Sequence, residues 1–129
     1  MRTYLVDGSN AVRRDGYDPR FPAVEDEKTA RWLSLLDALA APLSGIRVEV
    51  FFDGPRRPLG GGFPALSVRF PMEGGADEMI LGCVRLLASS GRGAVVVTED
   101  GGLGEEARRE GARVLRFSEF EGRLRRGKA

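Results

Sequence analysis

The chain contains no histidine and a single cysteine among its 129 residues. The lack of histidine excludes Ser-His-Asp and Cys-His catalytic groups, histidine-ligated zinc and the usual general base near neutral pH. One cysteine excludes internal disulfides and cysteine-rich zinc clusters, and the apolar neighbours of Cys83 at helical spacing are typical of a small buried residue. If the protein catalyses hydrolysis, the nucleophile is best supplied by metal-activated water at a site with oxygen ligands.

Lysine is also scarce, since only Lys28 and Lys128 of the 20 basic residues are lysines. The others are arginines, whose planar side chains bind phosphate through two hydrogen bonds at once. The net charge of +1 does not indicate a partner by itself. An arginine-rich surface that simply faces solvent is the alternative interpretation.

Long apolar runs are missing too. No uninterrupted run approaches the roughly 18 to 20 apolar residues that a membrane span needs, and the N-terminus lacks a basic segment followed by an apolar one. We therefore expect a cytoplasmic protein with no membrane partner. The length fits one domain, residues 1–129.

Short apolar runs alternate with segments of helical periodicity along the chain. The expected strands are residues 2–6, 46–52, 66–70, 94–98 and 113–117, and the expected helices are 25–41, 76–89, 102–110 and 118–126. Loops are expected at 11–24 and 54–64, and Ser118 with Glu121 predicts a capping box for the last helix. This order predicts an α/β sandwich in which helices flank a central, mainly parallel sheet.

Four aspartates follow or adjoin these elements: Asp7, Asp53, Asp77 and Asp100. Because parallel sheets bind ligands beyond the carboxyl ends of their strands, we expect these side chains to meet at one edge. Each has a structural alternative: Asp7, Asp53 and Asp100 precede glycine as turn residues do, and Asp77 suits a helix N-cap or first turn. Four like charges in one place nevertheless favour a divalent cation that compensates them.

Several polar residues adjoin the predicted acidic site. Ser9 and Asn10 follow Asp7, and Asn10 could bind a metal or a phosphate oxygen, or could cap a helix. Thr98 could contribute a hydroxyl to the site or could simply be a β-prone residue. The arginine pairs near these segments are expected to bind a polyanion at the rim of the site; they are Arg13, Arg14, Arg56 and Arg57.

Five segments, YLVDGSNAV, VEVFFDGPRR, GGADEMI, VVVTEDGGLGEEARREGA and FSEF, follow one another over nearly the whole chain. In this order they resemble the motifs of the YacP-like NYN domains, a bacterial subgroup of the PIN-like nuclease superfamily. The resemblance implies a PIN-like three-layer fold and a ribonuclease that depends on Mg²⁺ or Mn²⁺. Asp7, Asp77 and Asp100 match the acidic catalytic positions, Asp53 matches the FDG position, and Asn10 matches the asparagine of the opening motif.

The chain departs from that pattern at three places. Ser9 stands where an aromatic residue is usual, Glu99 stands where a small hydroxyl residue is more common, and the segment between Asp53 and Asp77 is short. These departures concern the choice of substrate more than metal binding.

We therefore expect an endoribonuclease that hydrolyses single-stranded RNA with little sequence specificity, as a monomer or weak homo-oligomer. The sequence leaves open whether the RNA is free or ribosome-associated and whether one or two ions bind. An inert RNA-binding module of the same fold is one alternative. A nucleotide-binding Rossmann-like protein is another, because Gly102, Gly104 and Ala107 form a G-x-G-x-x-A motif, although acids surround the helix start where pyrophosphate would bind.

Overall fold

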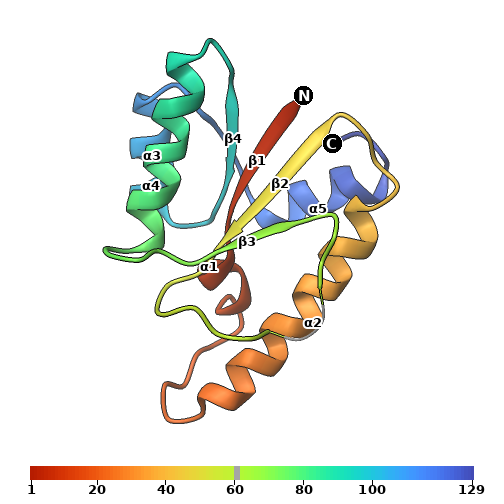
Figure 1. Cartoon of the computed structure of the whole chain (residues 1–129), viewed down its shortest axis with the longest axis vertical. Helices are drawn as coiled ribbons and strands as arrows, with labels where there is room; N and C mark the ends of the chain where they lie inside the picture. The colour runs from red at the N-terminus through yellow and green to blue at the C-terminus, as the bar shows by residue number, and fades with distance from the viewer. Residues whose placement is uncertain (60–61) are drawn as a thin grey trace.

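A computed structural model describes residues 1–59 and 62–129, so that Gly60 and Gly61 of the predicted 54–64 loop lie outside the described residues. The strands are β1 (Arg2–Asp7), β2 (Ile46–Phe51), β3 (Ser67–Arg69), β4 (Ala94–Val97) and β5 (Arg113–Leu115). They form one 5-stranded sheet in the order β3-β2-β1-β4-β5, and each pairing within it is parallel (Figure 1). The predicted parallel sheet is confirmed.

The helices are α1 (Gly8–Val12), α2 (Pro22–Ala40), α3 (Ala76–Ser89), α4 (Gly101–Arg109) and α5 (Phe117–Arg125). α3 and α4 cover one face of the sheet, and α2 and α5 cover the other (Figure 1). This arrangement confirms the predicted three-layer sandwich. Within the described ranges, none of the helices combines the length and apolar character that crossing a bilayer requires.

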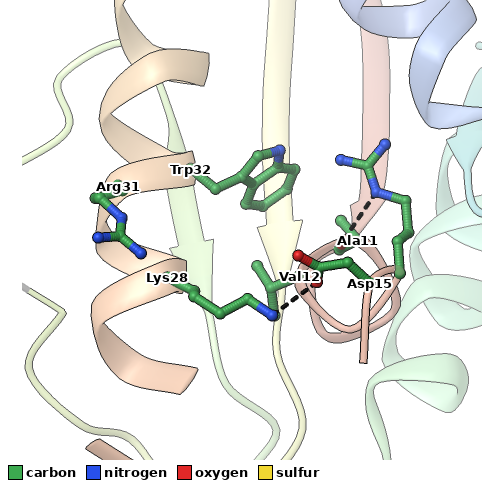
Figure 2. A pocket seen from close by; sticks show the side chains of 7 residues that line it. Ala11, Val12, Asp15, Lys28, Arg31 and Trp32 are labelled. Carbon is green, nitrogen blue, oxygen red and sulfur yellow. Dashed lines mark hydrogen bonds and ion pairs between the residues drawn. The ribbon is translucent and has the colours of Figure 1, made fainter. Parts of the chain in front are cut away.

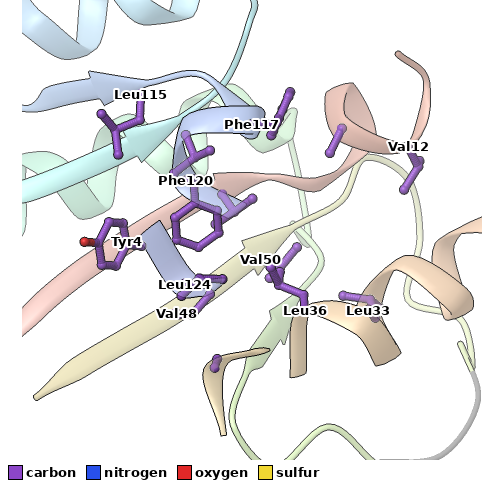
Figure 3. Packing of buried hydrophobic residues seen from close by; sticks show 14 of the residues in the cluster. Tyr4, Val12, Leu33, Leu36, Val48, Val50, Leu115, Phe117, Phe120 and Leu124 are labelled. Carbon is purple, nitrogen blue, oxygen red and sulfur yellow. The ribbon is translucent and has the colours of Figure 1, made fainter. Parts of the chain in front are cut away.

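Alternation along the strands produces a hydrophobic core on each face of the sheet. Tyr4 of β1 packs toward α5, where its ring centroid lies 5.0 Å from that of Phe120 (Figure 3). The next residue, Leu5, points to the opposite face and packs in the cluster that contains Ile80 of α3. Because successive side chains of a strand point to opposite faces, buried β1 anchors both helical layers.

The observed boundaries of the helices differ most from the predicted ones around α2. This helix begins at Pro22, ahead of the predicted start at Glu25, because proline suits the first turn of a helix, where its missing N–H is not needed. The short helix α1 also shortens the predicted 11–24 loop from its other end. The connection between the two helices is therefore limited to residues 13–21.

The predicted capping box of the last helix is wrong. α5 begins at Phe117, so Ser118 already lies inside the helix, and no side chain of the N-cap residue bonds to the helix start. Glu121 instead accepts a hydrogen bond from the indole Nε1 of Trp32 at 3.2 Å. The Phe117 amide donates to Glu99 Oε2 at 3.3 Å, so a carboxylate distant in sequence takes over part of the capping task.

Cys83 lies on α3 at the edge of the core, where it is half-buried. Its Sγ accepts a hydrogen bond from Arg69 at 3.7 Å, and burial raises the pKa of the thiol. Cys83 packs against the core as predicted, but the predicted burial is only partial.

Candidate functional site

The four predicted aspartates lie around the point where the strand order reverses. Asp7 ends β1 and Asp100 follows β4, and these two strands are neighbours on either side of the reversal. Asp53 follows β2, and Asp77 lies in the first turn of α3. All of them line one pocket of about 440 Å³. The topology therefore gathers acids that are far apart in the sequence.

The four side chains differ in exposure. Asp7 is only 4% exposed, whereas Asp53, Asp77 and Asp100 reach solvent. The remaining residues that line the pocket are Ser9, Asn10, Arg13, Gly75 and Glu78. The pocket thus has a buried carboxylate at its base and exposed carboxylates around its opening.

Thr98 connects two of the aspartates. Its Oγ1 donates a hydrogen bond to Asp7 Oδ2 at 2.9 Å and accepts one from the backbone amide of Asp100 at 3.1 Å. Thr98 is 2% exposed, so these bonds are shielded from water. The hydroxyl therefore fixes the ends of β1 and β4 relative to each other, which is a positioning role consistent with its predicted place beside the site.

A second connection links Asp53 to two elements. The Asp53 amide donates to Ser9 Oγ at 2.8 Å, and Asp53 Oδ1 accepts from the Ala76 amide at 3.0 Å. Ser9 belongs to α1 and Ala76 begins α3, so Asp53 ties the end of β2 to both helices. One of its carboxylate oxygens therefore satisfies a backbone amide at the start of α3.

Asn10 joins the same region from α1. Its Oδ1 accepts a hydrogen bond from the Glu99 amide at 2.9 Å and lies 3.4 Å from Thr98 Oγ1, whose single proton is donated to Asp7. The helix cap at this point is Asp7, whose Oδ1 accepts from the Asn10 amide at 3.4 Å. The cap that the sequence allowed for Asn10 is therefore supplied by the aspartate.

Asp100 also has a capping role. Its Oδ1 accepts hydrogen bonds from the amides of Gly102 at 2.9 Å and Leu103 at 3.2 Å. These are amides that a Rossmann-like protein would use to bind pyrophosphate. Because both amides already donate to the Asp100 carboxylate, they are not free to bind a pyrophosphate, which argues against the nucleotide-binding alternative. The second carboxylate oxygen of Asp100 is not used in this cap.

Asp77 differs from the other three acids, because it has no hydrogen-bond or ion-pair partner among the residues that the structure describes. Its pKa is raised by partial burial and then by the negative charges of Asp100 and Asp53. An acid without a partner and with a raised pKa is the type of group that a cation would stabilise.

The pKa of Asp7 is raised from 3.8 to about 6. Burial is the largest cause, the charges of Asp77 and Asp53 add to it, and the hydrogen bond from Thr98 opposes it. The electrostatic coupling agrees with the placement of these acids around one pocket. A positive ion there would lower both raised pKa values.

The donor atoms suit a hard divalent cation, since carboxylate and hydroxyl oxygens are the ligands that Mg²⁺ and Mn²⁺ prefer. In the described part of the chain, however, no three acidic or cysteine side chains lie close enough together, as placed, to hold one ion. The acids share a pocket without forming a finished coordination sphere. Chemically the residues fit a metal, and binding one would draw the side chains together.

The predicted arginines do not share one location. Arg13 lines the acidic pocket, where it pairs with Glu25 at 2.5 Å and lies 3.9 Å from the Tyr17 ring centroid. Arg57 pairs with Asp26 at 3.0 Å, which ties the loop after β2 to α2.

The other two arginines lie elsewhere. Arg56 is exposed in the loop after β2. Arg14 lines a different cavity and pairs with Glu121 at 3.3 Å. Of the predicted RNA-binding arginines, only Arg13 therefore lines the acidic pocket.

Glu78 also lines the acidic pocket, although it was not among the residues predicted for the site. It follows Asp77 in the first turn of α3 and adds another carboxylate to the lining. The signal was present in the sequence, because two acids occur together where the helix begins.

No family model and no curated protein sequence matches the chain. The parallel five-stranded sheet with helices on both faces defines the class of fold, an α/β sandwich that is similar to the YacP structures. Solved structures that match include two of Rae1 (YacP) from Bacillus subtilis. A mutant of that protein matches with a TM-score of 0.73 and 20% identity over 99% of this chain and 77% of the other.

A second structure of Rae1 (YacP) matches with a TM-score of 0.69 and 21% identity, over 99% of this chain and 76% of the other. The chain thus has a YacP-like fold, as its motifs indicated.

Proposed function

We propose that the protein is a divalent-metal-dependent ribonuclease that hydrolyses phosphodiesters of single-stranded RNA, free or ribosome-associated. The observation that carries the proposal is the set of four aspartates from distant segments that line one pocket. Arg13, the basic residue of that lining, is already paired with Glu25. The negative charge of the pocket is therefore poorly compensated by the protein, and the YacP-like fold supports the same function.

In this proposal Asp7, Asp53, Asp77 and Asp100 would hold Mg²⁺ or Mn²⁺, and Asp7, Asp77 and Asp100 are the catalytic acids. When bound, the ion supplies Lewis acidity that polarises the phosphate and makes water a better nucleophile at neutral pH. The Asp77 carboxylate can turn toward a cation without breaking a hydrogen bond or an ion pair, because it makes none with the described residues.

Other residues of the chain would position these acids and the RNA. Thr98 holds Asp7 and Asp100 in register through its hydroxyl, and Ser9 and Asn10 fix α1 to the ends of the neighbouring strands. Arg13 is proposed to orient the RNA backbone at the pocket. The RNA is proposed to contact Arg14, Arg56 and Arg57 outside the acidic pocket.

One observation favours a second candidate, an RNA-binding module without turnover. As placed, no three of the acidic side chains in the described ranges lie within reach of a single ion. A protein that had lost metal binding could keep this fold and still bind RNA. The two candidates differ in their need for a divalent ion.

The test is a cleavage assay on single-stranded and structured RNA in Mg²⁺, Mn²⁺ or EDTA, with Asp77→Asn as the variant. Because Asp77 is exposed and unpartnered in the described chain, its substitution should change stability by less than about 0.5 kcal/mol. Glu73→Gln is a matched control, because it removes an exposed acid just before α3 that does not line the pocket.

We expect cleavage by the wild type and Glu73→Gln in Mg²⁺ or Mn²⁺, none in EDTA, and a loss of at least about a hundredfold in Asp77→Asn. Equal cleavage by Asp77→Asn would remove this residue from the catalytic role. Binding of RNA with no metal-dependent cleavage would support the RNA-binding module instead.

A further inference from the structure

A second cavity, of about 470 Å³, lies between α1 and α2 (Figure 2). Its size falls in the range of roughly 300 to 1,000 Å³ that small-ligand cavities occupy. The residues that line it are Ala11, Val12, Arg14, Asp15, Lys28, Arg31 and Trp32. It shares no lining residue with the acidic pocket.

The charge of this lining is mainly positive. Lys28 and Arg31 come from α2 and Arg14 from the segment after α1, whereas Asp15 is the single acid of the lining. Lys28 Nζ lies 2.7 Å from Asp15 Oδ1, and this pair spans the cavity (Figure 2). Three cations and one carboxylate line the cavity, although Arg14 also pairs with Glu121 at 3.3 Å and Arg31 with Glu27 at 3.4 Å. The Arg31–Glu27 pair is exposed and contributes little, so a phosphate can compete for that cation.

Trp32 adds an aromatic surface with a fixed orientation. Its Nε1 donates to Glu121 at 3.2 Å, and its ring meets Phe52 edge-on at a centroid distance of 6.4 Å. The indole is only partly buried and still lines the cavity. A held aromatic ring beside cations is the combination on which nucleic-acid bases stack while their phosphates are bound.

The cavity also lies next to the proposed catalytic pocket. Ser9 and Asn10 of α1 line the acidic pocket, and Ala11 and Val12 of the same helix line this cavity. A helix with its side chains is about 10 to 12 Å across, so a short length of single strand could reach from one to the other.

We propose that this cavity binds one nucleotide of single-stranded RNA, with its base against Trp32 and its phosphate on Lys28 and Arg31. The inference deepens the proposed ribonuclease function, because it names where the substrate strand is held beyond the cleavage pocket. Binding at this cavity needs neither metal nor cleavage, so it can be tested separately.

Substitutions of Asp15 and of the cations are expected to change RNA affinity in opposite directions. Its carboxylate occupies Lys28, so a phosphate must compete with it for that cation. Asp15 is largely exposed, and removal of its charge should leave the fold intact. Asp15→Asn is therefore expected to bind RNA more tightly, whereas Lys28→Ala and Arg31→Ala are expected to bind it more weakly.

The experiment uses the fluorescence of Trp32, the single tryptophan of the chain. A short uridine oligoribonucleotide is titrated into the full-length protein in EDTA, and base-free polyphosphate is titrated separately. Arg92→Ala is the matched control, because Arg92 is exposed and lines neither the cavity nor the acidic pocket.

We expect a saturable change in emission with RNA, and a dissociation constant about tenfold higher in Lys28→Ala or Arg31→Ala, the scale of one charge-assisted contact. Asp15→Asn should lower that constant roughly threefold, and Arg92→Ala should leave it unchanged. Polyphosphate should not reproduce the change in emission.

An unchanged emission at saturating RNA, the same change in emission with polyphosphate, or wild-type affinity in Lys28→Ala would overturn the inference. If RNA binds as expected but is never cleaved, the inference stands and the ribonuclease proposal fails. If RNA is cleaved and Lys28→Ala binds it like the wild type, the inference alone fails.

Discussion

Asp7 shows how one residue meets two opposing demands. Its side chain caps α1 and accepts the hydrogen bond from Thr98, so the fold uses it as an acceptor. Burial and the charges of Asp77 and Asp53 meanwhile raise its pKa to about 6, so the fold disfavours its ionised form. A cation bound beside it would resolve this conflict.

The raised pKa of Asp7 predicts how stability changes with pH when EDTA removes metal ions. Below about pH 3, the carboxyl is mostly protonated in both states. As the pH rises from 3.8 to about 6, the unfolded chain loses the proton while the folded chain keeps it, so the free energy of unfolding falls. The full decrease is on the order of 2 to 3 kcal/mol and persists above the folded pKa.

Asp7→Asn should lack this decrease, because the amide does not titrate. Denaturant unfolding of both proteins at pH 4 and pH 7 measures the difference and cancels the contributions of other groups. A difference between the two proteins that does not change with pH would show that Asp7 has an ordinary pKa.

At the scale of elements, α1 lies very close to the end of β2. A Cβ atom on Gly8 would lie 2.6 Å from the Phe52 ring and 2.9 Å from the Phe51 carbonyl oxygen. Both contacts are too short for any side chain, so glycine at this position lets α1 turn directly out of β1. That turn places Ser9 and Asn10 at the acidic pocket.

Gly8→Ala is therefore expected to destabilise the protein by about 1 to 3 kcal/mol, the usual cost of forced overpacking. The matched control is Gly82→Ala in the middle of α3, where a Cβ meets nothing within 4 Å. That control should stabilise the protein by up to about 1 kcal/mol, because alanine favours helices over glycine. Thermal or denaturant unfolding measures both, and changes of the same sign would contradict this packing.

Asp53 links β2 to α3, and two substitutions separate its structural role from its charge. Asp53→Asn keeps an oxygen that can accept from the Ala76 amide, so stability should remain close to the wild type while metal affinity falls. Asp53→Ala also removes the acceptor, and should cost about 0.5 to 2 kcal/mol more in unfolding free energy. Equal stability of the two variants would show that this hydrogen bond contributes nothing.

At the scale of the whole molecule, the parallel sheet and the edge that gathers the aspartates could be predicted from the sequence. Apolar runs bounded by glycine, proline and acids mark the strands, and the topology of parallel sheets brings their carboxyl ends together. A helix after Asn10 was one interpretation of the sequence, but the start of α1 at Gly8 could not be predicted, because Gly8–Val12 has neither the length nor the periodicity of an amphipathic helix.

The features that the sequence did not predict depend on contacts between residues that are distant in the sequence. Glu121 was predicted to form a capping box with Ser118, but it accepts a hydrogen bond from Trp32, which lies 89 positions away in the sequence. Thr98 and Asp7 are 91 positions apart, so their hydrogen bond likewise has no local signal. The cavity beside Trp32 depends on the packing of α2 against α1, which no motif encodes.

The central claim is that the acidic pocket binds a divalent ion, and a titration with Mn²⁺ followed by calorimetry tests it most directly. We expect saturable binding by the wild type and Glu73→Gln, with affinity lower by about tenfold or more in Asp77→Asn. Absence of saturable binding, or equal affinity in Asp77→Asn, would contradict it.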